Sequence, residues 1–300
     1  MKKNKLILIL ILNIVFSQKI LIPMDEEQTD HLKAYGVAFW ALERGMTVEW
    51  LLNYRGGVFM LDYHGSVAQE AQIRGVSADV ISEAQAASIY AEIDGGNMEV
   101  VRLEKAPKIA VYTPPNKRPW DDAVTMALSY AEIPYDVIYD EEVLSNLLPL
   151  YDWLHLHHED FTGQYGKFYV SFKNATWYKE GKKDAEKLAK KLGFNKVSEA
   201  KLAVAKKIKE FVVSGGFLFA MCSATDSYDI ALAAEGVDIC REMFDGDPMD
   251  SDIDKKLDFS KTLAFKDFTL VKNPNQYEFS SIDATQKRRI NPKVDFFTLF

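Results

Sequence analysis

From Lys108 onward, short apolar runs alternate with stretches in which apolar residues recur at helical spacing. Uninterrupted apolar runs are typical of parallel strands buried on both faces, and the amphipathic stretches between them are typical of crossover helices. The pattern therefore predicts an α/β domain with a parallel sheet, whose sites lie at the carboxyl ends of the strands. We expect strands over residues 108–112, 137–139, 153–157 and 217–221, and helices over 120–131, 141–147, 179–192 and 198–213.

The part of the chain before Lys108 predicts a separate lobe of strands and helices. We expect a helix that Asp25 or Thr29 caps and that Gly45 ends, and a second helix over residues 82–93. Strands are expected over residues 19–23, 48–52, 58–61 and 98–103. A seam between Ala106 and Pro107 would then divide an N-terminal α/β lobe, residues 18–106, from a second domain, residues 107–300.

The sequences at the two ends of the chain predict a signal peptide and a truncated domain. Lys2, Lys3 and Lys5 precede the apolar residues 6–16, a stretch too short to anchor the chain across a bilayer. With Ser17 at a small-residue cleavage position, this pattern predicts a signal peptide over residues 1–17 and a periplasmic or secreted protein with no membrane attachment after cleavage. Residues 294–300 are almost entirely apolar with no polar tail, so we expect the domain to be truncated at residue 300.

Charge and missing motifs narrow the range of partners. The net charge of −8 argues against nucleic-acid binding, because no basic stretch outweighs the acidic residues. Neither a Gly-x-Gly-x-x-Gly pattern nor a Walker pattern occurs, so no nucleotide or other cofactor is expected. The expected partner is a small molecule or a ligand of the cell envelope.

The most informative segment is residues 215–226, where five apolar residues run into Cys222 and a helical pattern follows. This order predicts a strand, a sharp turn and a helix, which would place the thiol at a helix N-terminus. There the helix dipole favours the thiolate, and neighbouring backbone N–H groups can hold an oxyanion. Two other interpretations stay open. Cys222 and Cys240 can form a disulfide in an oxidising compartment, or Cys222 can be a buried and inert thiol.

A second cluster of candidate residues follows the strand expected over 153–157. Strand alternation places His155, His157 and Glu159 on one face and His158 with Asp160 on the other. Imidazole and carboxylate groups could bind zinc, the loop after them could contact a substrate, or the group could be a buried polar network. The acidic residues 245–254 do not follow a calcium-loop spacing and indicate a solvated loop.

The strand order and the elbow Met221-Cys222-Ser223 resemble the class I glutamine amidotransferase-like superfamily over residues 108–239. The resemblance implies a flavodoxin-like three-layer fold with a parallel sheet and a cysteine nucleophile. It places Cys222 at the nucleophile position and the loop of Thr162 and Gly163 at the oxyanion-hole position. The superfamily's general base is a histidine after a later strand. No histidine follows Cys222 here, so either that residue lies beyond residue 300, or His157 or His158 substitutes, or there is no catalysis.

Longer strings resemble a group of exported Bacteroidetes proteins labelled "asparagine synthetase B". The matching strings are residues 31–36, 51–57, 120–124, 155–168 and 219–231. The label implies ATP-dependent amide synthesis, but synthetases of that name have a catalytic cysteine at position 2, where this chain has Lys2, and the chain lacks their ATP loop.

Two functions follow from these observations. The first is a cysteine hydrolase acting on an amide or acyl substrate, and the second is a catalytically inert binding module of the same fold for a carbohydrate or a cell-envelope partner. A hydrolase that uses a metal on His155, His157 and Glu159 is a more distant third, and no metal is expected in the site. The candidate catalytic residues are Cys222, His157 and His158, and the candidate oxyanion or substrate-binding residues are Thr162, Gly163, Ser223, Glu159 and Asp160.

Overall fold

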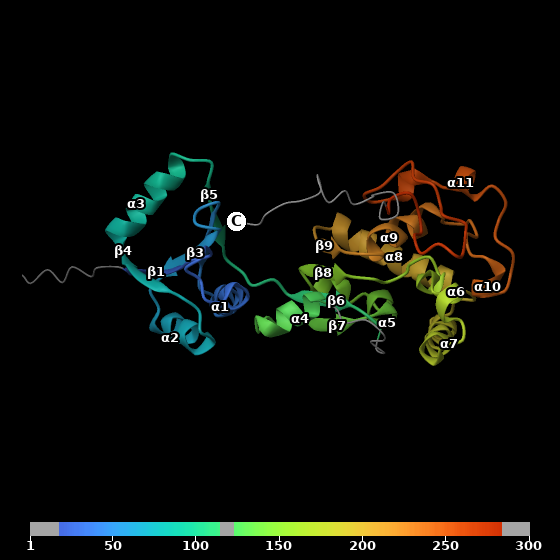
Figure 1. Ribbon diagram of the computed structural model, residues 1–300, viewed down its shortest axis with the longest axis horizontal. Helices are drawn as coiled ribbons and strands as arrows, with labels where there is room; N and C mark the ends of the chain where they lie inside the picture. The colour runs from blue at the N-terminus through green and yellow to red at the C-terminus, as the bar shows by residue number, and fades with distance from the viewer. Residues whose placement is uncertain (1–17, 115–122, 284–300) are drawn as a thin grey trace, which may run out of the picture. The chain divides into compact units, whose positions relative to one another are not determined.

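The computed structural model describes residues 18–114 and 123–283 (Figure 1). The chain divides into two compact units: the first runs up to Ala106 and also includes Met126–Pro134, and the second contains the remainder. The signal peptide expected over residues 1–17 and the truncated end expected at residue 300 lie outside the described residues. Among residues 18–114 and 123–283, no helix is both long enough and apolar enough to cross a lipid bilayer.

The first unit contains a five-stranded antiparallel sheet with the strand order β4-β1-β3-β2-β5. Alternate residues of each strand point to opposite faces, so each face has its own core. Ile20 and Ile22 of β1 pack in the core that includes α1 and α2, whereas Leu21 packs in the core that includes α3. The elements are β1 (Gln18–Ile22), α1 (His31–Glu43), β2 (Val48–Leu52), β3 (Val58–Asp62), α2 (Gly65–Arg74), β4 (Asp79–Ser82), α3 (Glu83–Asp94) and β5 (Glu99–Leu103).

The cap of α1 differs from the expectation. Asp30 caps the helix, because its carboxylate accepts the N–H of Lys33 at 3.0 Å. The two residues that we expected at this position have other partners: Asp25 pairs with Arg55 at 2.6 Å, and the Thr29 hydroxyl donates to the Gly75 carbonyl at 2.6 Å. Both side chains therefore hold neighbouring loops rather than the helix end.

The second unit contains a four-stranded sheet with the order β7-β6-β8-β9, and all three strand pairs are parallel. This confirms the parallel α/β sheet expected from the sequence. The strands are β6 (Ile109–Tyr112), β7 (Asp136–Ile138), β8 (Trp153–Leu156) and β9 (Phe217–Ala220). The helices are α5 (Asp140–Leu144), α6 (Tyr169–Phe172), α7 (Thr176–Lys191), α8 (Val197–Val213), α9 (Ala224–Ala233), α10 (Glu242–Asp245) and α11 (Ile253–Lys256), with α4 (Ala123–Tyr130) at the division between the units and short 3₁₀ turns at Leu148–Leu150, Tyr165–Lys167 and Phe259–Lys261.

One face of the parallel sheet lies in a continuous core, whereas the other face is buried at β6 and β8 and exposed at β9. One face packs against α5, α8 and α9 in a continuous core that includes Tyr112, Leu154 and Leu156. On the opposite face, Phe217 is 60% exposed and Phe219 is 41% exposed. The expectation that the strand before Cys222 is buried on both faces is therefore wrong for β9, which lies at the end of the strand order among the described strands.

The helix α9 is enclosed by two cores. Ala224 and Tyr228 pack against the sheet, and Ile230 and Ala233 pack against the C-terminal segment. Asp229, which is 1% exposed, accepts the backbone N–H groups of residues 263, 264 and 265 at 2.7, 2.8 and 2.7 Å. These contacts fix the helix that begins directly after Cys222.

Candidate functional site

Cys222 lies on the sharp turn between β9 and α9, with φ of 50°. This left-handed conformation is uncommon for a residue with a side chain and is typical of a strained turn. The turn is held on both sides, because the Met221 N–H donates to Leu156 O at 2.9 Å and the Ala224 N–H donates to Met221 O at 3.2 Å. The Cys222 side chain is exposed, and its sulfur is not in a disulfide.

Cys240 is in a different environment. Its thiol is buried, free of any disulfide, and donates a hydrogen bond to the Thr162 carbonyl at 3.2 Å. Burial raises the pKa of the Cys240 thiol well above its usual value. Neither the disulfide between the two cysteines nor the buried form of Cys222 occurs in the structure.

The histidines follow the strand next to the elbow. In the parallel register Leu156 pairs with Ala220, so His157 and His158 follow β8 at the level of the turn. The His157 carbonyl accepts the N–H of Ala224 in the first turn of α9 at 3.3 Å, and the rings of His157 and His158 lie 3.7 Å apart between centroids.

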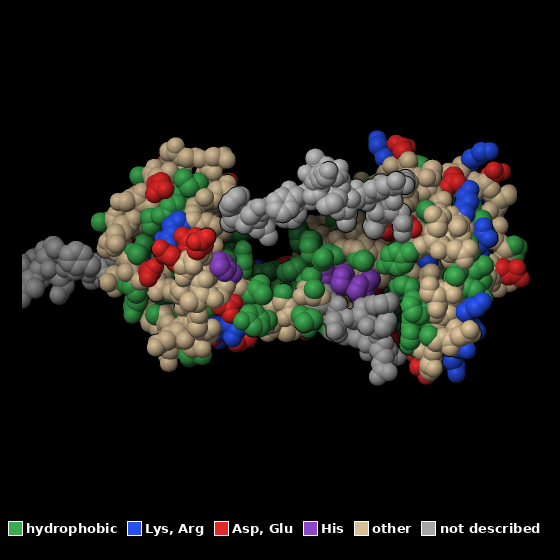
Figure 2. All heavy atoms as spheres, in the orientation of Figure 1, with side chains coloured by type: hydrophobic (Ala, Val, Ile, Leu, Met, Phe, Trp, Pro, Cys, Tyr) green, Lys and Arg blue, Asp and Glu red, His purple; other side chains and the backbone are tan. Residues whose placement is uncertain are grey.

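These two histidines are partly exposed, whereas His155 is fully buried. Figure 2 shows a group of histidine side chains on the visible surface of the second unit, beside hydrophobic side chains. The structure therefore gives His157 and His158, but not His155, a place where a ligand can reach them.

The two acidic residues of the loop organise its backbone. Glu159 accepts the N–H of His157 at 2.8 Å, and its side chain is buried. Asp160 accepts the N–H and the hydroxyl of Thr162 at 2.7 and 2.6 Å and the N–H of Gly166 at 2.9 Å. Burial raises the pKa of Asp160 above its usual value, although these hydrogen bonds oppose the shift. Both carboxylates are thus turned toward the loop itself.

The expected oxyanion-hole residues are only in part suitably placed. The Thr162 N–H is already bound by Asp160, and Thr162 is 2% exposed. A Cβ built on Gly163 would lie 2.9 Å from the backbone nitrogen of Ser198 in α8, so this residue is packed against a helix. Ser223 directly follows the nucleophile position, where the backbone N–H of an elbow contributes to an oxyanion hole. Ser223 is therefore the better-placed donor.

Two residues that the sequence analysis missed lie beside the elbow. Burial raises the pKa of Tyr277 to about 12, and the neighbouring Cys222 adds to this shift. Asp226, in the first turn of α9, accepts the Ser280 hydroxyl at 3.2 Å, and burial raises the pKa of Asp226 to about 6. A carboxyl group four residues after an elbow cysteine was a detectable signal, but nothing in the sequence connects Tyr277 with Cys222.

The carboxyl ends of β6 and β7 carry a buried ion pair. The Lys201 ammonium, 5% exposed, donates to Asp140 at 2.8 Å and to the hydroxyls of Tyr112 and Tyr139 at 2.8 and 2.9 Å. Burial alone would lower the pKa of Lys201, but the Asp140 carboxylate raises it above its usual value. All three ammonium protons have acceptors, so this cluster stabilises the rim rather than offering a ligand site.

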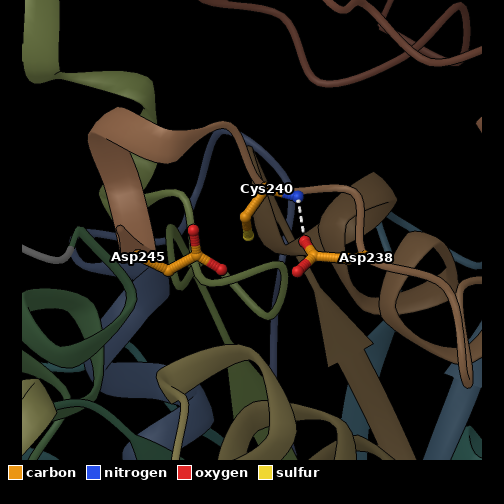
Figure 3. Close-up of side chains that lie close together, drawn as sticks. All are labelled: Asp238, Cys240 and Asp245. Carbon is orange, nitrogen blue, oxygen red and sulfur yellow. Dashed lines mark hydrogen bonds between the residues drawn. The ribbon is translucent and has the colours of Figure 1, made fainter. Parts of the chain in front are cut away.

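One group of metal-ligand type occurs among the described residues, formed by Asp238, Cys240 and Asp245, whose ligand atoms lie within 4.8 Å of one another (Figure 3). The Lys196 ammonium already pairs with Asp238 at 2.5 Å and with Asp245 at 3.0 Å. The Lys196 ammonium therefore already supplies a positive charge to the two carboxylates of this cluster. The ligand atoms of His155, His157 and Glu159 do not form such a group in the described part of the chain.

In comparisons with known proteins, no family model, no curated protein and no solved structure matches this chain.

Proposed function

We propose that this protein is an exported cysteine hydrolase that acts on an amide or acyl substrate, with Cys222 as its nucleophile. The observation that carries this proposal is the exposed Cys222 thiol on a left-handed turn between a parallel strand and a helix. Such a turn presents a nucleophile at the rim of the sheet and places backbone N–H groups beside it.

The proposed reaction has two steps. The Cys222 thiol gives its proton to the imidazole of His157 or His158, and the sulfur attacks the carbonyl carbon. The oxyanion is held by the Ser223 N–H, and the leaving group takes the proton from the imidazolium as its bond to carbon breaks. Water then hydrolyses the thioester, releasing the acid and restoring the thiol.

The parallel α/β sheet of the second unit is consistent with a flavodoxin-like, class I glutamine amidotransferase-like fold, which remains part of the proposal. Periplasmic or secreted localisation rests on the sequence of residues 1–17, and a small-molecule or cell-envelope ligand rests on the absence of nucleotide motifs.

The second candidate is a catalytically inert binding module of the same fold. One observation favours it: the Thr162 N–H, in the loop at the expected oxyanion-hole position, is already bound by Asp160. Under this alternative the exposed Cys222 thiol does not react with an acyl substrate.

Hydrolysis of p-nitrophenyl acetate separates the two candidates. The hydrolase should release a rapid burst of about one equivalent of p-nitrophenol as the acyl enzyme forms. Cys222→Ser should lose the burst, and Cys240→Ser, a matched change at the buried thiol, should keep it. A wild-type protein without a burst, or a burst that survives Cys222→Ser, would support the inert module.

A further inference from the structure

Three side chains with metal-ligand atoms come together in the short segment of residues 238–245. The Cys240 thiol and the carboxylates of Asp238 and Asp245 each offer one ligand atom, and these atoms lie within 4.8 Å of one another. Figure 3 shows the two carboxyl groups on either side of the thiol, with all three turned toward one another. Ligand atoms bound to one tetrahedral zinc ion lie about 3.5 Å apart, so small side-chain movements would bring all three onto one ion.

One buried oxygen of this group has no hydrogen-bond donor. The Asp245 side chain is only 9% exposed, although the sequence indicates a solvated loop over residues 245–254. Its Oδ1 is buried, and no donor reaches it among residues 18–114 and 123–283. Its other oxygen, Oδ2, pairs with the Lys196 ammonium at 3.0 Å. A buried carboxylate oxygen without a partner costs free energy, so this oxygen points to a ligand from outside the chain.

The Lys196 ammonium does not balance the charge of the group. It pairs with Asp238 Oδ2 at 2.5 Å, with Asp245, and with both oxygens of Asp247 at 2.7 Å. One positive charge therefore faces three carboxylates. Since Asp247 is half-exposed and holds the ammonium through two oxygens, Lys196 can keep this partner when a stronger cation takes its place at Asp238 and Asp245.

A cavity beside the group gives an ion access to it. Asp238, Lys196 and Thr162 line this cavity, whose volume is about 300 Å³. The Thr162 carbonyl is also the acceptor of the Cys240 thiol, at 3.2 Å. The cavity has room for a water molecule, which is the usual fourth ligand of a zinc ion that is held by three side chains.

We propose that Asp238, Cys240 and Asp245 form a zinc-binding site, with a water molecule from the cavity as the fourth ligand. This inference goes beyond the proposed function and does not depend on it, because neither Cys222 nor the histidines take part. The donor set selects the metal. Calcium and magnesium prefer oxygen ligands alone, whereas a thiolate combined with carboxylates suits zinc.

Binding changes three contacts and involves no oxidation. The S–H bond of Cys240 breaks, its proton passes to the solvent, and the sulfur bonds to the metal. The Lys196 ammonium leaves Asp238 and Asp245 and stays with Asp247. The free oxygen of Asp245 then lies beside a positive charge.

The test titrates the purified protein, freed of metal by a chelator, with Co²⁺ and then with Zn²⁺. A bond between cobalt and a thiolate gives a charge-transfer absorption band, which carboxylates and histidines do not give. We expect the band to saturate at about one equivalent of Co²⁺ and to disappear when Zn²⁺ displaces it, with a dissociation constant for Zn²⁺ of about 1 μM or tighter. Cys240→Ser should lose the band, and Cys222→Ser should keep it.

Variants of the charged residues test the rest of the site. Asp245→Asn should weaken the affinity for Zn²⁺ at least about tenfold, since even residues that only support metal ligands have effects of this size. Asp252→Asn, at an exposed acid of the same loop, is the matched control and should leave the affinity unchanged. Lys196→Met removes the competing ammonium and should tighten binding about tenfold.

Three results would overturn the zinc site. These are a wild type without the band, a band that is lost in Cys222→Ser but survives Cys240→Ser, and an affinity for Zn²⁺ that Asp245→Asn leaves unchanged. Circular dichroism shows whether each variant is folded. If Cys240→Ser does not fold, the comparison of Asp245→Asn with Asp252→Asn decides, because both changes keep the size of the side chain.

Discussion

The two cysteines of this chain lie in two regions that differ in exposure, in backbone conformation and in the groups around the thiol. Cys222 is exposed on a left-handed turn. Cys240 is buried, donates to a backbone carbonyl and lies among carboxylates that, after burial, further raise the pKa of its thiol. Local backbone geometry and neighbouring groups therefore decide whether a cysteine thiol is accessible, and only an accessible thiol could react with a substrate.

The two regions also differ in how their charges are balanced. Around Cys240, the Lys196 ammonium pairs with Asp238, Asp245 and Asp247, and a cavity of about 300 Å³ lined by Thr162, Lys196 and Asp238 lies beside the cluster. At the elbow, Asp226 is buried and carries a raised pKa. Burial raises the pKa of both Asp245 and Asp226, but the Lys196 ammonium opposes the shift at Asp245, whereas only the neutral Ser280 hydroxyl and backbone hydrogen bonds oppose it at Asp226.

The largest expected effect is on the anchoring of the elbow helix. Asp229→Ala removes the acceptor of three backbone N–H groups from residues 263–265. We expect the free energy of unfolding, measured in urea, to fall by about 2–4 kcal/mol, because buried donors lose their partners. Glu210→Ala, at an exposed ion pair with Lys207 within α8, is the control and should change stability by less than about 0.5 kcal/mol. Equal losses in both variants would contradict the anchoring role.

A smaller effect is expected from breaking the charge balance around Cys240. Lys196→Met leaves the partly buried carboxylates of Asp238 and Asp245 without a cation, and we expect a loss of about 2 kcal/mol in urea unfolding at pH 7. The deficit should shrink below pH 4, where the carboxylates take up protons. Alkylation of Cys222 should not change, and Lys190→Met, at an exposed lysine, is the matched control. A slower alkylation of Cys222 would show that the two regions are coupled.

The smallest expected effect is a gain in stability, and it comes from removing the charge of Asp226. The pKa of Asp226 is about 6 in the folded protein and about 3.8 in the unfolded chain, so the folded state binds more protons between these values. Stability contributed by the protonated form is lost as the pH rises from about 4 to about 6.

Asp226→Asn should therefore be more stable than the wild type by about 1–2 kcal/mol at pH 7.5 and equal to it at pH 4. Thermal unfolding at both pH values measures the difference. A variant that is less stable than the wild type at pH 7.5 would mean that the ionised carboxylate is the favoured form.

The sequence predicted much of the parallel sheet, because apolar runs of strand length are separated by strongly amphipathic helices. The turn at Cys222 was predictable for the same reason, since small and polar residues interrupt the change from strand to helix. The exposed face of β9 was not predictable. The sequence predicts Phe217 and Phe219 to be core residues, but both are exposed, because burial of an apolar side chain depends on which elements cover it.

Other parts of the structure could not be predicted, because their sequence patterns are too weak. The helix α2 buries only Val67 and Ala71, so its apolar periodicity is faint, and we did not expect it. Asp25, Thr29 and Asp30 are all suitable caps, and only tertiary partners decide among them. The Lys167 ammonium binds the carbonyls of Val271 and Glu278, and the Ser280 hydroxyl binds Asp226; such long-range contacts have no signature in the sequence.

The most direct measurement is the alkylation of both cysteines in the folded protein, followed by mass spectrometry of each peptide after treatment with iodoacetamide at pH 7. We expect Cys222 to react at least about a hundredfold faster than Cys240 and faster than a cysteine in an unfolded peptide, and the two rates to become equal in denaturant. Equal rates in the folded protein, or a Cys222 that reacts no faster than an unfolded peptide thiol, would contradict this expectation.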